Sequence, residues 1–105
     1  MARPLRVEYL GAFYHVINCG NNRENIYKND RDKEKFLEYL QKGSERFSVA
    51  IHSYCLMSNH FHLLVETAQP NLSMAMQWIN VSYATYFNRK GGRHGHLFQE
   101  RFKAT

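Results

Sequence analysis

The sequence has few cysteines and no long hydrophobic run, and both absences limit what the chain can be. Its two cysteines, Cys19 and Cys55, form no CxxC pair, so neither a disulfide framework nor a thiolate zinc site is indicated. Buried free thiols are expected instead. No segment approaches the apolar length that spans a bilayer, and the N-terminus lacks the apolar core of a signal peptide. We therefore expect a cytoplasmic protein without membrane contact.

No internal repeat, low-complexity tract or interdomain linker divides the 105 residues. This length fits a single domain, 1–105, that can bury a core of its own. A hydrophobic content of 44%, with 14% aromatic residues, indicates a folded globule rather than disorder. The sequence has few acidic residues: nine Asp and Glu residues stand against fourteen Lys and Arg residues. The resulting net charge of +5 favours a polyanionic partner.

Hydrophobic periodicity and turn residues predict an alternation of strands and helices. The expected elements are a strand over 12–19, a helix from a cap at Asn29 or Asp30 to about Phe47, a strand over 49–57, a strand that begins after Ser58-Asn59, and a helix from after Pro70-Asn71 to about Asn88. This order is most of a ferredoxin-like α+β sandwich, an antiparallel sheet with two helices on one face. No fourth strand is apparent in the basic tail. The other sheet face is left for a ligand.

Two histidines, His60 and His62, alternate with Phe61 in the strand after the turn. Strand side chains change face at every residue, so both imidazoles leave the same face, with backbones about 7 Å apart. Neutral imidazoles this close can converge on one divalent cation and leave coordination positions open for a substrate oxygen. Half-exposed strand histidines without a ligand are the alternative.

Three further residues near the pair have open roles. Glu66 lies on the same strand face as the two histidines. It could be a metal ligand, a partner that orients a ligand or a solvated residue at the strand end, and the last interpretation is favoured. His15 could also face a metal, although a satisfied sheet histidine is favoured. Tyr54 is expected to share a face with His52 and Leu56 and to form a wall of the site.

The last stretch of the chain, residues 88–103, carries five cations and one acid. Its glycines let the backbone approach a ligand closely. Phe98 and Phe102 could stack on bases while the cations meet phosphates, or they could anchor a solvated basic loop to the core. The candidate DNA-binding residues are Arg89, Lys90, Arg93, His96, Phe98, Arg101 and Lys103.

Several blocks of the sequence, in a fixed order, resemble the single-tyrosine HUH transposases, and in particular the REP-associated tyrosine transposases of the insertion-sequence-200-like group. The blocks are Ala2-Arg3-Pro4-Leu5-Arg6-Val7-Glu8-Tyr9, Tyr14-His15-Val16, Gly20-Asn21-Asn22-Arg23, Cys55-Leu56-Met57-Ser58-Asn59-His60-Phe61-His62-Leu63-Leu64, Phe87-Asn88-Arg89-Lys90 and Gly95-His96-Leu97-Phe98-Gln99-Glu100-Arg101-Phe102-Lys103-Ala104. The resemblance covers nearly the whole chain. The joint order of these blocks is far more specific than the His-x-His pair alone.

This resemblance implies a ferredoxin-like catalytic domain, usually a homodimer, that cuts and rejoins single-stranded DNA at hairpin-flanked sites. His60 and His62 would be the paired ligands of Mg²⁺ or Mn²⁺, and the cation would polarise the scissile phosphate. A tyrosine hydroxyl would then attack in line and give a 5′-phosphotyrosine. The basic segment Arg89–Lys103 would bind the DNA backbone and hairpin.

The chain departs from this family in two places. Cys19 stands where relatives usually show Arg, which puts one DNA contact in doubt. The family's nucleophilic tyrosine and last metal ligand lie on a helix downstream of the Arg-Phe-Lys block, so the nucleophile is expected beyond Thr105 and the domain is expected to lack that C-terminal element. Tyr83 and Tyr86 are weak substitutes, because their spacing with Met76 and Ile79 favours core packing.

Two other functions remain open at this stage. One is a non-catalytic nucleic-acid-binding module of the same fold, which would use exposed aromatic rings and cations. The other is a fragment that only folds or dimerises, covering its sheet edge with a partner.

Overall fold

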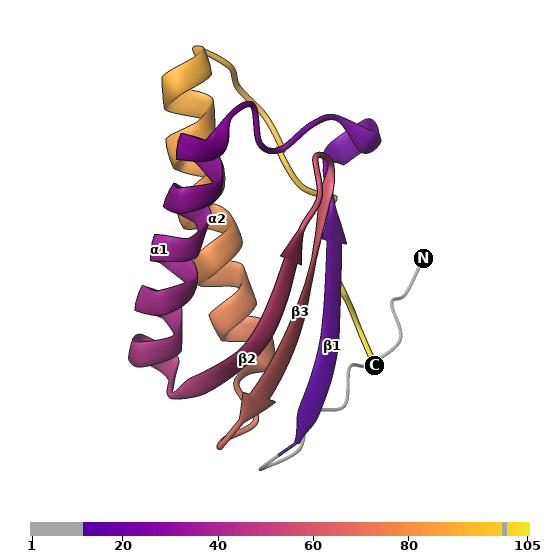
Figure 1. The fold of residues 1–105 in the computed structure, drawn as a ribbon, viewed down its shortest axis with the longest axis vertical. Coiled ribbons are helices and arrows are strands. Elements are labelled where there is room, and N and C mark those ends of the chain that lie inside the picture. Colours follow the sequence, from indigo (N-terminus) through magenta and orange to yellow (C-terminus); the bar gives the residue numbers. More distant parts are fainter. Residues whose placement is uncertain (1–11, 100) are drawn as a thin grey trace.

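The computed structural model describes residues 12–99 and 101–105, drawn in Figure 1. The elements are β1 (Phe13–Cys19), a 3₁₀ turn (Asn21–Arg23), α1 (Asp30–Phe47), β2 (Val49–Leu56), β3 (His60–Thr67), α2 (Leu72–Gly91) and β4 (Lys103–Ala104). The predicted strands and helices are confirmed, with ends that differ by at most a few residues. The N-terminal block of the resemblance, residues 2–9, lies outside the described residues, as does Glu100. Within the described part of the chain, neither helix is long and apolar enough to cross a membrane.

The four strands form one antiparallel sheet in the order β2-β3-β1-β4. Both helices cover the same face of this sheet, as Figure 1 shows. The ferredoxin-like α+β architecture predicted from the sequence is therefore confirmed. The opposite face, which no helix covers, is called the open face below.

A fourth strand, β4, is present although none is apparent from the sequence. Lys103 and Ala104 pair with Ile17 and Val16 at the edge of the sheet. Two backbone bonds between His15 and Thr105, of 2.9 and 3.1 Å, extend this pairing. A strand of two residues is too short to show a period of two, so only its pairing identifies it.

Aromatic rings from both helices and the sheet fill the core between the layers. Phe36 of α1 lies 4.8 Å from Phe61 of β3 and 5.3 Å from Tyr83 of α2, measured between ring centroids, and all three are fully buried. Along β3, Phe61, Leu63 and Val65 turn toward the helices. The alternating residues of β3, which include both histidines, consequently face away from the helices.

The two helices approach closely at Gly43, which lies inside α1 without interrupting it. A Cβ atom at this position would lie 2.7 Å from the Cγ1 atom of Ile79 on α2. The missing side chain therefore makes room for α2. At the start of α1, the side chain of Asn29 accepts a hydrogen bond from the backbone N–H of Asp32 at 3.0 Å, which confirms the predicted cap.

A bulge in β2 changes which side chains share a face. The pairing of β2 with β3 shifts between Ile51 and Ser53, so His52 is the extra residue. Tyr54 pairs with the buried Leu63 and belongs to the helix-covered face by register. The expectation that Tyr54 and His52 share a face, with Tyr54 as a wall of the histidine site, is therefore wrong, because the bulge reverses the alternation between them.

Candidate functional site

His60 and His62 lie side by side on the open face of β3. Their ring centroids are 5.1 Å apart and the ring planes are nearly perpendicular, at 74°. Both side chains are half-buried, and the sheet separates them from the two helices. The shared face predicted from the period of two is observed.

Each of the two rings is held through its Nδ1 atom. The Nδ1 atom of His60 lies 2.8 Å from Oδ1 of Asn59, whose amide nitrogen donates to the carbonyl oxygen of Arg23 at 3.5 Å. The amide orientation makes Asn59 Oδ1 an acceptor, so His60 carries its proton on Nδ1. The lone pair of His60 is then on Nε2, the tautomer that a ligand histidine needs.

His62 has a different partner, the imidazole of His15 on β1. The Nδ1 atom of His62 lies 3.0 Å from Nε2 of His15, and the two rings stack with centroids 5.2 Å apart and an interplanar angle of 19°. A proton on His62 Nδ1 satisfies this bond and again leaves the lone pair on Nε2. Among the described residues, no hydrogen bond occupies the Nε2 atom of either His60 or His62. The position of His15 was left open by the sequence, because its partner is 47 residues away.

The electrostatic surroundings keep His62 neutral. Partial burial, and then the neighbouring imidazoles of His60 and His15, lower the pKa of His62 below its ordinary value of 6.5. A neutral imidazole offers its lone pair to a cation, whereas an imidazolium cannot. The state favoured at neutral pH is thus the one that binds metals.

The pair alone does not enclose an ion. In residues 12–99 and 101–105, no three His, Cys, Asp or Glu side chains are arranged to hold a metal together. Glu66 is occupied elsewhere, because its Oε1 atom lies 2.9 Å from Nε2 of His52 near the other end of β3. Two imidazoles with open coordination positions could take their other ligands from water, from a substrate or from residues outside this range.

The two cysteines flank the histidines on the neighbouring strands. Cys19 of β1 pairs with His60, and Cys55 of β2 pairs with His62. Strand β3 lies between the cysteines, which puts their backbones about 10 Å apart, too far for a disulfide. Both thiols are free, as predicted, but Cys55 is exposed and Cys19 is only partly covered, so the expectation that they are buried is wrong.

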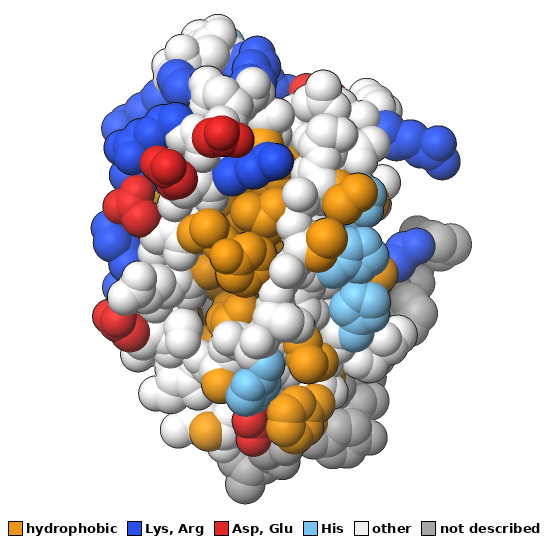
Figure 2. All heavy atoms as spheres, viewed as in Figure 1, with side chains coloured by type: hydrophobic (Ala, Val, Ile, Leu, Met, Phe, Trp, Pro, Cys, Tyr) orange, Lys and Arg blue, Asp and Glu red, His pale blue; other side chains and the backbone are white. Residues whose placement is uncertain are grey.

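Other side chains of the open face extend this surface. Lys103 of β4 pairs with Ile17, which itself pairs with His62, so a cation lies on the histidine side of the sheet. At the far end, the ring of Phe13 stacks on His52. Figure 2 shows histidine side chains in two groups, each beside hydrophobic side chains, and one group also beside an acidic side chain.

The weak candidates for a nucleophile, Tyr83 and Tyr86, belong to the helix layer. Tyr83 is fully buried and its hydroxyl donates to the backbone oxygen of Ile26. Tyr86 donates to Oδ1 of Asp32 at 2.9 Å. Burial, together with the Asp32 carboxylate, raises the pKa of both hydroxyls. Both lie on the helix side of the sheet, away from the histidines. The packing interpretation is confirmed for Tyr83, whereas Tyr86 is half-buried between the helices.

Phe98 and Phe102 anchor the C-terminal segment to the core. Phe98 is only 7% exposed, and its ring packs against Phe61 and Tyr83 with centroids 5.8 and 6.2 Å apart. Phe102 is buried in the same cluster. The inclusion of Phe98 among DNA-stacking residues is therefore wrong, because the sheet and α2 cover its ring.

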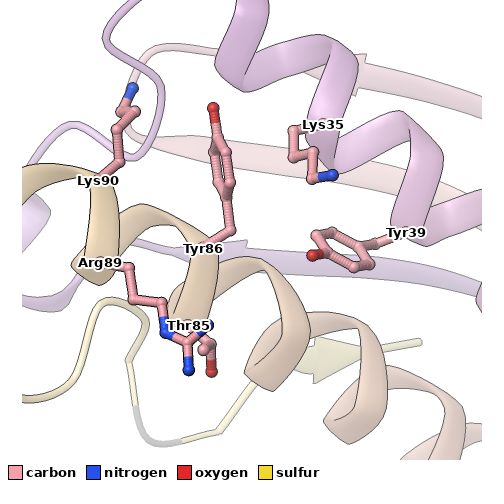
Figure 3. A pocket seen from close by; sticks show the side chains of 6 residues that line it. All are labelled: Lys35, Tyr39, Thr85, Tyr86, Arg89 and Lys90. Atoms are coloured by element: carbon pink, nitrogen blue, oxygen red, sulfur yellow. The ribbon is translucent and has the colours of Figure 1, made fainter.

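The cations of this segment lie in different surroundings. Lys90 pairs with the buried carboxylate of Asp32, and Arg93 pairs with Glu24 at 2.7 Å. Arg89 is exposed and lines an open hollow between α1 and α2; its other lining residues are Lys35, Tyr39, Thr85, Tyr86 and Lys90, shown in Figure 3. His96 is exposed in the loop after α2, and Arg101 is half-buried. Lys103, which pairs with Ile17, is the candidate DNA-binding residue that the strand register places on the histidine face.

The fold and the site define an α+β protein whose antiparallel sheet carries two neighbouring imidazoles on the face that no helix covers. The particular family follows from sequence: residues 9–105 match the family described as "Transposase IS200 like". The chain belongs to this transposase family. A search of curated proteins gives no match.

Two solved structures share the fold of this chain. The first, described as the REP-associated tyrosine transposase bound to a REP hairpin, superposes with a TM-score of 0.74 at 16% identity, over 100% of this chain. The chain spans 61% of the length of that transposase. The second, a Deinococcus radiodurans R1 protein described as a transposase, gives a TM-score of 0.73 at 14% identity and covers 99% of this chain and 85% of its own.

Proposed function

We propose that this chain binds single-stranded and hairpin DNA on the open sheet face and takes part in metal-assisted cutting and rejoining of the strand. His60 and His62 hold one Mg²⁺ or Mn²⁺ ion through their Nε2 atoms. The observation that carries this proposal is the pair of rings whose Nδ1 atoms are engaged by Asn59 and His15. Both Nε2 atoms are then left for a shared ligand.

The donor set fits a cation that accepts both nitrogen and oxygen. Imidazole suits transition metals, and carboxylate, carbonyl and water oxygens suit Mg²⁺ and Mn²⁺, so two histidines with open positions favour Mn²⁺ or a largely hydrated Mg²⁺. A bound cation polarises the scissile phosphate and offsets its developing charge. Asn59 and His15 keep the rings oriented, and the lowered pKa of His62 keeps that ring neutral.

The covalent step requires a tyrosine, and we place it outside residues 12–99 and 101–105. Attack of its hydroxyl oxygen on phosphorus forms a 5′-phosphotyrosine and breaks the bond to the 3′ oxygen. The strand that leaves then ends in a 3′-hydroxyl, which can attack the phosphotyrosine in turn and rejoin the DNA. None of the described tyrosines occupies a register position on the open face, which supports this placement.

The DNA partner is proposed from charge and from the similar structure. Lys103 lies on the histidine side of the sheet, where it can meet a phosphate. The exposed Arg89 and His96, together with Arg101, extend the contacts beyond this face. The structurally similar REP-associated transposase is described as bound to a REP hairpin, and we propose a hairpin ligand for this chain as well.

The metal part of the proposal is tested by Mn²⁺ binding, followed by electron paramagnetic resonance of the free ion. We expect the unchanged protein to bind Mn²⁺ and the double variant His60→Ala with His62→Ala to lose binding. His94→Ala, which removes an exposed loop histidine, is the matched control and should keep it. An Mn²⁺ affinity of the double variant equal to that of the unchanged protein would contradict the proposal.

A non-catalytic nucleic-acid-binding module is the second candidate. It is favoured by the lack of a three-ligand metal cluster among the described residues. Binding of hairpin DNA that is indifferent to Mn²⁺ and to both histidines would support this function. An adduct with a suicide oligonucleotide, formed by a longer chain that contains the tyrosine, would contradict it.

We also propose a homodimer, the assembly expected from the family. The outer edge of β2 pairs with no further strand in the part of the chain that the structure describes. Light scattering after gel filtration would measure the mass, and a monomer at all concentrations would contradict this assembly.

A further inference from the structure

Phe13 and His52 form a stacked pair of rings at the surface of the open face. Their centroids lie 5.6 Å apart with an interplanar angle of 29°. Phe13 is 60% exposed, although it is a large hydrophobic residue. His52 is also exposed, and its Nε2 atom lies 2.9 Å from Oε1 of Glu66, the residue that pairs with Phe13 across the strands. The stack therefore has a fixed orientation and ring surface open to solvent.

The stack lies in line with the histidine pair. Phe13 begins β1, and Ile17, four residues further along the same face, pairs with His62. At the rise of an extended strand, this spacing is about 14 Å. His15 lies between them on the same face and stacks on His62. Ring surfaces thus follow one another from the end of the sheet to the proposed metal site.

The chemistry of this strip fits a nucleic acid better than a protein. Six large hydrophobic residues are exposed among the described residues, and only Phe13 and Leu64 lie on the open face. Two such side chains supply much less than the roughly 800 Å² that each partner contributes to a stable protein interface. Flat ring faces along the strip, with Lys103 beside its histidine end, instead match the combination of stacking surface and cation that binds single strands.

We propose that Phe13 and His52 form a stacking platform for an unpaired base of the same DNA strand whose phosphate lies at His60 and His62. This inference rests on the proposed function, since it uses the same strand and the same face. Every base has a π-face, so the platform accepts any base and positions the strand rather than reading its sequence. The platform therefore sets how the strand crosses the sheet beside the site of cutting.

The test uses fluorescein-labelled oligothymidine and fluorescence anisotropy, in the presence of a chelator so that no metal contributes. Loss of one stacked base lowers affinity by about tenfold in comparable cases, and we expect this loss in Phe13→Ala. Phe13→Trp, which keeps a ring, should bind at least as tightly as the unchanged protein. Tyr54→Ala is the matched control, because Tyr54 is an aromatic residue of similar exposure, 55%, whose register position is on the other face.

A second ligand isolates the base from the phosphates. An oligonucleotide of the same length built from abasic units should bind Phe13→Ala and the unchanged protein equally. A drop of less than about twofold for oligothymidine in Phe13→Ala, or an equal drop for the abasic strand, would overturn the platform. Phe13→Ala that shifts the molecular mass in light scattering but leaves oligothymidine affinity unchanged would also overturn it, in favour of a protein contact. The chelator separates these results from Mn²⁺ binding, so the platform and the metal site can fail independently.

Discussion

The two faces of the sheet hold similar rings in opposite surroundings. On the helix-covered face, Phe36, Phe61 and Tyr83 meet one another in full burial. On the open face, the stacks of Phe13 on His52 and His15 on His62 remain near solvent.

What holds the rings differs as well. The buried rings are held by packing from all sides, which is a non-directional contribution to stability. The histidines of the open face are held by directional bonds at single ring nitrogens, to Glu66, to Asn59 and between His15 and His62. We infer that stability resides mainly on one face and chemistry on the other, so that substitutions should separate the two.

The largest expected effect tests this separation directly. Phe36→Ala removes a ring that contacts Phe61, Tyr83 and Tyr27 and should lower the free energy of unfolding by about 4 kcal/mol. Phe13→Ala, on the exposed face, should lower it by no more than about 0.5 kcal/mol. Urea unfolding followed by circular dichroism measures both. Similar losses in the two variants would break the comparison.

A smaller loss is expected at Asp32, the buried charge of the helix layer. Its carboxylate accepts bonds from the Lys90 ammonium, the Tyr86 hydroxyl and the backbone N–H of Lys28, and so joins the start of α1 to the end of α2. Asp32→Asn keeps the shape and removes the charge. Because Lys90 stays partly hydrated, we expect a loss of about 2 kcal/mol in the free energy of unfolding rather than the full cost of a broken buried pair.

The same carboxylate predicts a dependence on pH. Burial alone would raise the pKa of Asp32, but the bonds from Lys90, Lys28 and Tyr86 outweigh it and hold the pKa below the ordinary value of 3.8. Ionised Asp32 therefore stabilises the native state above pH 3.8, and this contribution is lost as the pH falls through the lower, folded value. Unfolding measured between pH 2 and 6 should show a shallower acid slope in Asp32→Asn. An unchanged slope would contradict this origin.

Most helices and strands of the fold could be predicted from local patterns in the sequence. The alternation along β3 predicted that His60 and His62 share a face, and the Asn29 cap predicted where α1 begins, because both signals involve residues close in the chain. The apolar spacing of α2 likewise predicted that Tyr83 is buried. Each of these follows from one element considered alone.

The features that were missed depend on pairing between distant elements. β4 exists only through its bonds to β1, and the bulge at His52 exists only in relation to β3. The contact of His15 with His62 depends on the register of β1 against β3. The burial of Phe98 depends on the return of the chain beneath the sheet after α2, which local composition does not specify.

The smallest effect concerns His15, which is expected to position His62 rather than to bind the metal itself. Its Nε2 atom lies 3.0 Å from Nδ1 of His62, and with His15 as the acceptor this bond selects the His62 tautomer that has its lone pair on Nε2. His15→Ala should weaken Mn²⁺ binding by about tenfold, the lower end of the effect of losing such a partner. Because the change lies on the open face, the free energy of unfolding should stay within about 0.5 kcal/mol of the unchanged protein.

Rescue by glutamine distinguishes positioning from packing at this residue. The side-chain oxygen of His15→Gln can accept the same proton, so this variant should recover most of the Mn²⁺ affinity that His15→Ala loses. If His15 acts only by filling space, His15→Leu should restore the Mn²⁺ affinity equally well, because leucine fills similar space without a hydrogen-bond acceptor. If His15→Leu binds Mn²⁺ as well as His15→Gln does, the hydrogen bond is not what orients His62. The open face would then depend on packing as the helix-covered face does, and the contrast between them would be one of exposure alone.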